Sequence, residues 1–483
     1  LTVAAAFAWM GMDFRKLNPG KISTPATASG PPVIYLGPRN SIAVLPFADG
    51  SSGVAQPWFA RGMAWELIDR LTRESQLRVA AAESSFHFSS TSGQPLVIAQ
   101  RLQVTYLLSG EVKLAGDTLS LSLQLYNARR QETSWARDFQ GDVSSFRDVQ
   151  RKVLEAVLDT LPGSEAPAGK LSQMEDPAAW MEYLRGRHLL SAGGGEQIRA
   201  ANGHFQEAIA RQAGYAEAWS ALAEGLLSLQ PDDAAAAGEA VARALQADPD
   251  MASALGWRSY IRRRFDRDWP GAFEAGQAAV GLRPGDARLL ALASRAAFSA
   301  ARFETAVKYM RESVSRDPVN LASRLGLGVA QEFAGDLDGA LTSYRLLLGL
   351  NPEYPAAHAY RARVKLLQDN PESALRESNQ EASPFWQSYS RALALTALDR
   401  QGEAASEING LVDDHADHAA YQLAEIMALA GNADAAFEWL ERAFRQRDGS
   451  MAGISGNRLL ESLHADPRWA EMMSRLEIPL DGK

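Results

Sequence analysis

Residues 321–352 read LASRLGLGVAQEFAGDLDGALTSYRLLLGLNP, and this stretch decides the fold. Apolar residues recur at spacings of three, four and seven on both sides of a polar break at Gly335-Asp336, which predicts two amphipathic helices joined by a tight turn. Asn351-Pro352 then ends the second helix, because proline cannot continue a helix. The buried face of the second helix is predicted to consist of Ala340, Tyr344 and Leu347.

The same helix–turn–helix unit recurs along most of the chain at a nearly constant spacing. One alanine in each unit, predicted to be buried, marks this spacing. Alanine suits the point where two helices come closest, because it is small and has the highest helix propensity. A period near 34 residues predicts a solenoid of helix–turn–helix units, which offers a binding surface rather than a reaction centre. With successive gaps of 36, 35, 34, 34, 34, 30 and 32 residues, the alanines are Ala201, Ala237, Ala272, Ala306, Ala340, Ala374, Ala404 and Ala436.

This order of small, aromatic and proline positions resembles the tetratricopeptide (TPR) consensus. The aromatic usual on the first helix is replaced here, for example by Gln331 or Arg263. The resemblance implies an all-α TPR superhelix of about eight helix–turn–helix repeats over residues 178–446, followed by C-terminal capping helices over residues 447–483.

Composition narrows the classes of function. The 483 residues are 46% apolar and 22% charged, as in globular proteins. The net charge of −9 argues against direct nucleic-acid binding, which needs a clustered positive field. Cysteine is absent, so thiol catalysis, disulfides and cysteine-bound zinc are excluded.

The first 40 residues fall into two parts. The apolar run LTVAAAFAWMGM at residues 1–12 is predicted to be the end of a truncated transmembrane helix; the core of a signal peptide and a short docking helix are the alternatives. Residues 13–40 are rich in proline, glycine, serine and threonine, which predicts a flexible linker.

Residues 41–161 differ in character from the rest. Short strands are predicted at 41–47, 77–82, 105–112, 118–127 and 132–139, with helices at 58–75, 95–102 and 142–161. This order predicts a small α/β domain with a mixed sheet, so that the whole chain is α+β. A second linker, residues 162–177, precedes the solenoid.

An ordered series of blocks in this region resembles the TolB-like amino-terminal domain, which occurs fused to TPR arrays in bacterial membrane proteins. The chain departs from that pattern at Arg61, Ala64 and Trp65, where such domains commonly have an acidic helix start. The blocks are SIAVLPF (41–47), WFARGMAWELIDRL (58–71), LRVAAAESSFHF (77–88), YLLSGEVKLAGDTLSLSLQLYNARRQETSWARDF (106–139) and SSFRDVQRKVLEAVLDTL (144–161).

Proteins of this layout resemble membrane-anchored signalling regulators with a winged-helix effector of the CadC type. The resemblance implies a non-catalytic sensor and protein-interaction region with one N-terminal membrane anchor, located at the inner membrane with residues 13–483 periplasmic; a cytoplasmic location is the alternative. Two other functions stay open: the regulatory half of an adenylate-cyclase- or kinase-type enzyme, and a periplasmic scaffold for envelope assembly.

We predict no catalytic, cofactor-binding or metal-binding residues. His415 and His418 are three residues apart, which gives only two convergent metal ligands, so solvated histidines near a helix end are the better interpretation. The predicted partner is a protein or peptide ligand, and a homodimer stays open.

The predicted binding surface is the inner face of the solenoid, built by the first helix of each repeat. Arginine and aromatic side chains on such a face are typical of binding hot spots, although filling gaps between repeats is an equally good interpretation of the aromatic ones. The candidate residues are Trp257, Arg264, Arg295, Glu332, Arg363, Tyr389, Tyr421 and Glu425.

Overall fold

The structure is a computed structural model that describes residues 37–50, 57–74, 77–88, 94–143, 146–162, 176–229 and 234–478. Residues 1–12 and most of the predicted linker 13–40 therefore lie outside the described residues. Within the described ranges the chain forms two compact units. Unit 1 comprises residues up to 293 together with 312–320, and unit 2 comprises 294–311 and the residues from 321 onward.

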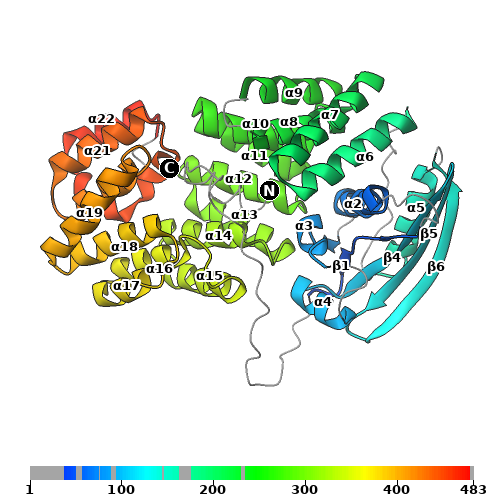
Figure 1. Cartoon of the computed structure of the whole chain (residues 1–483), viewed down its shortest axis with the longest axis horizontal. Coiled ribbons are helices and arrows are strands. Elements are labelled where there is room, and N and C mark those ends of the chain that lie inside the picture. The colour runs from blue at the N-terminus through cyan, green and yellow to red at the C-terminus, as the bar shows by residue number, and fades with distance from the viewer. Residues whose placement is uncertain are drawn as a thin grey trace. The chain divides into compact units, whose positions relative to one another are not determined.

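A mixed sheet forms the N-terminal part of unit 1 (Figure 1). Its strand order is β3-β1-β4-β5-β6, with β2 paired to β4. The pairs β1–β3, β1–β4 and β2–β4 are parallel, whereas β4–β5 and β5–β6 are antiparallel. The strands are β1 (Ser41–Val44), β2 (Ala48–Asp49), β3 (Arg78–Val79), β4 (Tyr106–Ala115), β5 (Thr118–Asn127) and β6 (Glu132–Asp142).

The predicted strands and helices of this region are confirmed, with shorter β1 and β3 and longer β4 and β6. The hairpin between β4 and β5 turns at Gly116, whose φ of 61° favours glycine. Strand β2 and helix α3 were not predicted, because two- and four-residue elements carry no periodic signal. The helices are α2 (Pro57–Glu74), α3 (Ala82–Ser85), α4 (Pro95–Leu102) and α5 (Phe146–Leu158).

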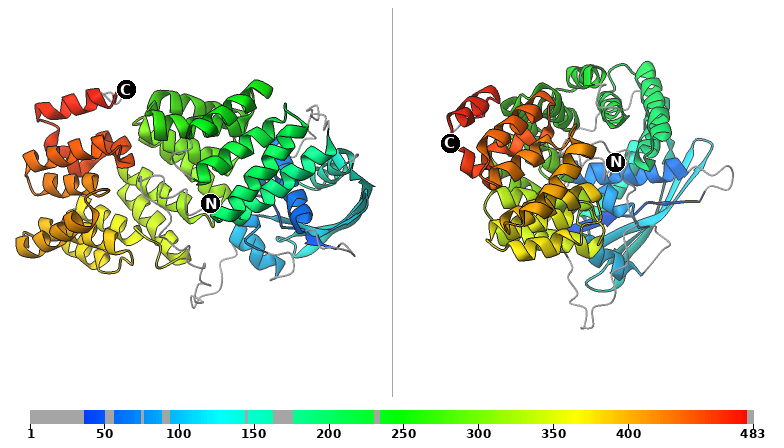
Figure 2. Two further views of the ribbon diagram at one scale, coloured as in Figure 1. Left: turned by 45° about the horizontal axis from the view of Figure 1, so that its top comes forward. Right: turned by 60° about the vertical axis from the view of Figure 1, so that its left-hand side comes forward.

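The two faces of the sheet are covered differently. Strand β5 alternates, so that Leu119, Leu121, Leu123 and Leu125 all join the larger core with α2 and α5. On the opposite face Leu107 packs with Leu102 of α4 in a smaller core. Both views of Figure 2 show β4, β5 and β6 as one continuous sheet. The result is an α+β chain, as predicted.

In the described part of the chain after the sheet, the helices form eight pairs. Those that begin in unit 1 are α6 (Pro177–Ala192) with α7 (Gly195–Arg211), α8 (Ala216–Leu229) with α9 (Ala234–Ala247), α10 (Ala252–Ile261) with α11 (Trp269–Leu282), and α12 (Ala287–Ser299) with α13 (Phe303–Arg316). A π-helical turn, η3 (Arg262–Asp266), extends α10. Those of unit 2 are α14 (Leu321–Phe333) with α15 (Leu337–Leu350), α16 (Ala357–Leu367) with α17 (Pro371–Ser378), α18 (Pro384–Ala397) with α19 (Gln401–His415), and α20 (Ala420–Leu429) with α21 (Ala433–Arg445).

All eight alanines that mark the period are buried, none of them more than 4% exposed. The predicted break between two helices at Gly335-Asp336 is also confirmed. Gly335 has a φ of 84°, and the Asp336 side chain accepts a hydrogen bond from the backbone N–H of Gly339 at 3.0 Å, which caps the next helix. The number of pairs and the position of the small residues therefore confirm an array of TPR-type helix pairs.

Three C-terminal elements end unit 2. They are two 3₁₀ helices, η4 (Gly449–Gly456) and η5 (Arg458–Leu463), and the helix α22 (Pro467–Arg475). Helix α22 is fixed to α21 by Arg475, which donates two hydrogen bonds to the carboxylate of Glu441 at 2.7 and 3.2 Å. The predicted capping helices are therefore partly 3₁₀ turns.

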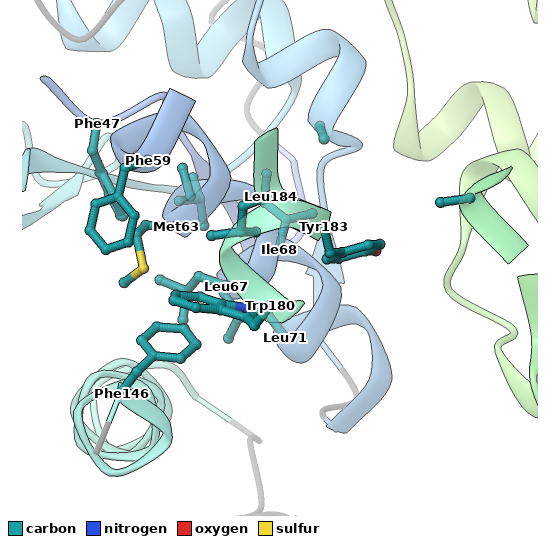
Figure 3. Close-up of a cluster of buried hydrophobic side chains, with 14 of the residues drawn as sticks. Phe47, Phe59, Met63, Leu67, Ile68, Leu71, Phe146, Trp180, Tyr183 and Leu184 are labelled. Atoms are coloured by element: carbon teal, nitrogen blue, oxygen red, sulfur yellow. The ribbon is translucent and has the colours of Figure 1, made fainter. Parts of the chain in front are cut away.

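The sheet region and the first helix pair share one core in unit 1 (Figure 3). Trp180 of α6 is 2% exposed, stacks on Phe146 of α5 at 4.1 Å between ring centroids, and meets the edge of Phe59 of α2 at 6.0 Å. Gly62 of α2 lies against Leu184 of α6, where an added Cβ would come within 3.2 Å of its side chain. Unit 1 therefore includes described residues on both sides of the predicted linker 162–177, of which residues 163–175 lie outside the described residues. The predicted domain boundaries stay a prediction.

The predicted inner-membrane location is corrected. Among the described residues, no helix combines the length and the apolar character that crossing a bilayer requires. The prediction depended on residues 1–12, which lie outside the described residues.

Candidate binding site

A buried polar cluster lies at the centre of unit 2, and Arg363 of α16 is its middle residue. Nε and Nη2 of Arg363 donate to Oε1 of Glu332 on α14 at 3.1 and 3.0 Å. Nη1 donates to Oε1 of Glu425 on α20 at 2.5 Å and to the hydroxyl of Tyr389 on α18. Four consecutive first helices thus each contribute one of these side chains. The polar cluster comprises Glu332, Arg363, Tyr389, Tyr421 and Glu425.

Every member of the polar cluster is at least 95% buried. The Tyr389 hydroxyl donates to Oε2 of Glu425 at 2.7 Å, so that the carboxylate is held through both of its oxygens. Burial of ions without such pairing is strongly unfavourable, which explains why the hydrogen bonds are so dense here.

The cluster has two carboxylates and one guanidinium, and the pKa shifts follow from this imbalance. Burial lowers the pKa of Arg363, but Glu425, Tyr389 and Glu332 together hold it well above its ordinary value. Burial raises the pKa of Glu332, and Arg363 offsets this only in part because it also pairs with Glu425. Burial likewise raises the pKa of both tyrosine hydroxyls well above the usual value. Within the cluster, Arg363 is therefore charged and the hydroxyls of Tyr389 and Tyr421 are neutral.

Asn457, between η4 and η5, completes the cluster. Its Nδ2 donates to Oε1 of Glu425 at 2.6 Å and to the hydroxyl of Tyr421 at 2.9 Å. Its Oδ1 accepts from the backbone N–H of Leu459 at 3.1 Å and more weakly from Nη2 of Arg363 at 3.4 Å. The side chain is 2% exposed, so a segment outside the repeats is bound to side chains of the first helices α16 and α20.

Three phenylalanines extend this contact, Phe298, Phe303 and Phe333, whose ring centroids are 4.8–5.8 Å apart. A Cβ added to Gly453 would come within 2.7 Å of Phe298, and one added to Gly456 within 2.4 Å of Phe303. The backbone of η4 therefore lies directly against the aromatic rings.

The eight residues that the sequence predicted for partner binding fall into two groups in the structure, five that lie together and three that lie elsewhere. Five of them come together as the polar cluster, but as buried partners of one another and of Asn457 rather than as the lining of an open groove. Sequence reasoning missed Asn457, although an asparagine directly before the apolar run of η5 is a helix-capping signal.

The other three predicted residues lie elsewhere. Arg295 of α12 is 5% exposed. Burial raises the pKa of Tyr354, and the charge of Arg295 offsets that increase only in part. In unit 1, Trp257 of α10 is half-buried under the guanidinium of Arg288 at 5.4 Å, and Arg264 lies over Phe265 in η3. A role for any of these residues in binding a partner stays a prediction.

In the part of the chain that the structure describes, no three His, Cys, Asp or Glu side chains form a group that could hold a metal ion. His415 and His418 have ring centroids 5.1 Å apart and both pack against Phe385. The two imidazoles therefore make an aromatic contact.

Comparisons with known proteins give limited likenesses. No family model matches the chain. A protein of Rhizobium meliloti (strain 1021) described as putative adenylate cyclase 3 is 28% identical over 171 residues, which are 34% of this chain and 29% of that protein. The chain thus spans well under half the length of this curated relative.

Three solved structures of low similarity also match parts of the chain. PilF of Pseudomonas aeruginosa is 18% identical, covering 43% of this chain and 94% of that one, with a TM-score of 0.36. YrrB, a TPR protein described as having an unusual peptide-binding site, is 17% identical, covering 42% and 96%, with a TM-score of 0.33. A TPR protein of Parabacteroides merdae is 10% identical, covering 56% and 100%, with a TM-score of 0.38. The chain is a sheet-containing array of TPR-type helix pairs by its own periodicity and geometry.

Proposed function

We propose that this chain is a non-catalytic protein-interaction region in which the helical repeats bind a peptide or protein partner. The observation that carries the proposal is the polar cluster, in which Arg363 of α16 and Tyr421 and Glu425 of α20 hydrogen-bond to Asn457 of a short segment that is not part of the repeats. Arg363 and Glu425 are in turn bound to Glu332 of α14 and Tyr389 of α18. This is the arrangement that recognition of a peptide by an array of helices requires.

The proposal includes a finer assignment for the sheet region. Residues 41–161 are proposed to be a TolB-like domain, and the chain the sensory part of a bacterial signalling or transcriptional regulator. The order of strands and helices supports this assignment, as does the joint core with α6, through which a change in the sheet region would reach the first repeat.

The test is selection of peptides from a random displayed library on the immobilised full chain, followed by calorimetric titration of each enriched peptide. We expect enriched sequences that bind with micromolar affinity to the folded chain and not to the chain in urea. Failure to enrich any peptide that binds the folded chain would contradict the proposal.

A second candidate function is the regulatory half of a cyclase-type enzyme, favoured by the 28% identity to putative adenylate cyclase 3. The corresponding test exchanges the 171 matching residues of that protein for those of this chain and measures cyclic AMP formed from ATP. Retained formation of cyclic AMP that responds to an enriched peptide supports this candidate, and formation that ignores every such peptide contradicts it.

A further inference from the structure

We propose that residues 449–463, the C-terminal segment, are an internal ligand of unit 2, and that their place is a binding site for an external peptide of the same chemistry. That peptide would form a short turn and present an asparagine carboxamide between glycine and leucine residues. The inference rests on the proposed function, because it names the kind of peptide that the repeats take and what must move to admit it.

The C-terminal segment does not have the conformation of a repeat. It consists of two 3₁₀ helices, η4 and η5. Helices of the 3₁₀ type are short and have weaker hydrogen-bond geometry than α-helices. It is held by buried apolar side chains, Met451, Ile454 and Leu460, each at most 1% exposed. A separate peptide of this length could therefore make the same contacts.

The polar cluster selects a carboxamide. Asn457 donates two hydrogen bonds, to Glu425 and Tyr421, and accepts from Arg363, so both halves of the amide are used. An aspartate at this position would lose both donors and bring a third negative charge beside Glu332 and Glu425. A leucine would remove the hydrogen bonds that Asn457 makes with Glu425 and Tyr421 inside a buried site. The site therefore discriminates by chemistry as well as by shape.

The three phenylalanines select glycine. Any side chain at Gly453 or Gly456 would meet an aromatic ring at 2.7 or 2.4 Å, which is closer than real Cβ contacts. Ile454 between them is fully buried. Read from these contacts, the recognised sequence is Gly-Ile-x-Gly-Asn-x-Leu-Leu, as in residues 453–460.

The segment lies between α21 and α22, which Arg475 and Glu441 join, so exchange requires it to leave its place as a loop between these two helices. Residues 445–447, which precede it, are exposed, and Arg447 has a φ of 55°. A tethered ligand competes at a high effective concentration, of millimolar order for a short flexible tether. An external peptide is therefore expected to bind weakly to the closed chain and to raise the open fraction as its concentration increases.

The absence of cysteine makes this exchange measurable. Two full-length variants, Leu460→Cys and Leu347→Cys, each place one thiol at a residue that is 0% exposed. Leu460 belongs to the C-terminal segment, whereas Leu347 lies in α15 and is the matched control. The probes are a synthetic peptide of residues 449–463 and the same peptide with Asn457→Leu, and the readout is the rate of reaction with a small disulfide reagent.

We expect Leu460→Cys to react at least about tenfold faster than Leu347→Cys, and its rate to rise by about threefold or more at millimolar peptide. The Asn457→Leu peptide should leave both rates unchanged. Hydrogen exchange on the unsubstituted chain gives a second measurement that needs no substitution. There the wild-type peptide should reduce protection of residues 449–463 and leave α15 unaffected.

Equal reaction rates for the two thiols, or rates and exchange that ignore the wild-type peptide, would overturn the inference. If library peptides still bind the folded chain in that case, the proposed function stands and only the internal-ligand inference is lost. If neither the library nor the synthetic peptide binds, both fail.

Discussion

Asp69 in α2 and Arg283 after α11 are 214 residues apart in the chain, yet Nη1 of Arg283 donates to Oδ1 of Asp69 at 2.7 Å. Arg73 of α2 donates to the other oxygen of the same carboxylate at 2.9 Å. Burial raises the pKa of Asp69, but the two guanidiniums more than offset this and hold it well below its usual value. The ion pair thus joins the sheet region to the third helix pair within unit 1.

Replacing Asp69 with asparagine is expected to destabilise unit 1 by about 1–3 kcal/mol, because the partly buried guanidiniums lose their counter-charge. The measurement is urea unfolding followed by circular dichroism. Asp148→Asn is the matched control, since its ion pair with Arg151 is largely exposed and solvent screening should make its contribution to stability small. Equal losses in the two variants would contradict this account.

Glu66 should make stability fall as the pH rises. Burial, and then the nearby Asp69 carboxylate, raise the pKa of Glu66 to about 7. Because the folded chain holds this proton more tightly than the unfolded chain, the stabilisation is complete below the unfolded pKa and is lost as the pH approaches 7. Glu66→Gln is expected to flatten the urea midpoint between pH 5 and 8, and a slope identical to that of the wild type would refute the assignment.

Arg363→Met tests the polar cluster. It leaves two buried carboxylates without their cation, for which we expect a loss of about 3–5 kcal/mol in the free energy of unfolding. Arg391→Met is the control, because the ion pair of Arg391 with Glu407 is partly exposed and its loss should cost about 1 kcal/mol or less. Thermal melts of both variants provide the comparison. Equal melting temperatures would contradict the predicted contribution of Arg363 to stability.

Asp448 begins η4, where its carboxylate accepts a hydrogen bond from the backbone N–H of Ser450 at 2.8 Å. Burial raises its pKa to about 6 even so. The raised pKa means that the C-terminal segment is held more tightly below pH 6 than above it. Asp448→Asn keeps the helix cap and removes the charge, so hydrogen exchange of η4 at pH 7.5 should become slower than in the wild type. Faster exchange would contradict the prediction.

Two neighbouring alanines of α9 test the packing of the repeats. Ala237 is fully buried, whereas Ala236 is exposed. Ala237→Leu forces extra methylene groups into a filled contact and should cost about 1–3 kcal/mol or more. Ala236→Leu should change the free energy of unfolding by less than about 0.5 kcal/mol. Chemical unfolding of the two single variants gives the answer directly.

The repeats could be predicted from sequence because their determinants are local and periodic. The eight alanines, the break at Gly335 and the hairpin at Gly116 each depend on residues close in the chain, and all were found in the expected places. The same offsets identified the five residues of the polar cluster, since equivalent positions of successive first helices face the same side.

What the sequence did not reveal depends on long-range contacts. The bond between Arg363 and Asn457 spans 94 residues, and no period or motif relates the two. Without that contact the five cluster residues look like an open surface, whereas with it they are a filled core. Arg295 shows the same limit, because its 5% exposure follows from packing that spacing alone does not specify.

Arrays of helical repeats are usually modular, because each repeat contacts only its neighbours and repeats can be gained or lost singly. Because of the polar cluster, we expect that unit 2 cannot gain or lose a repeat in this way. The cluster takes at least one charged group or hydroxyl from each of four consecutive repeats, so removing a repeat would leave an ion without its counter-ion and adding one would separate them. We therefore expect this half of the array to unfold as one cooperative block, and its repeat number to be fixed in a way that sequence periodicity alone does not require.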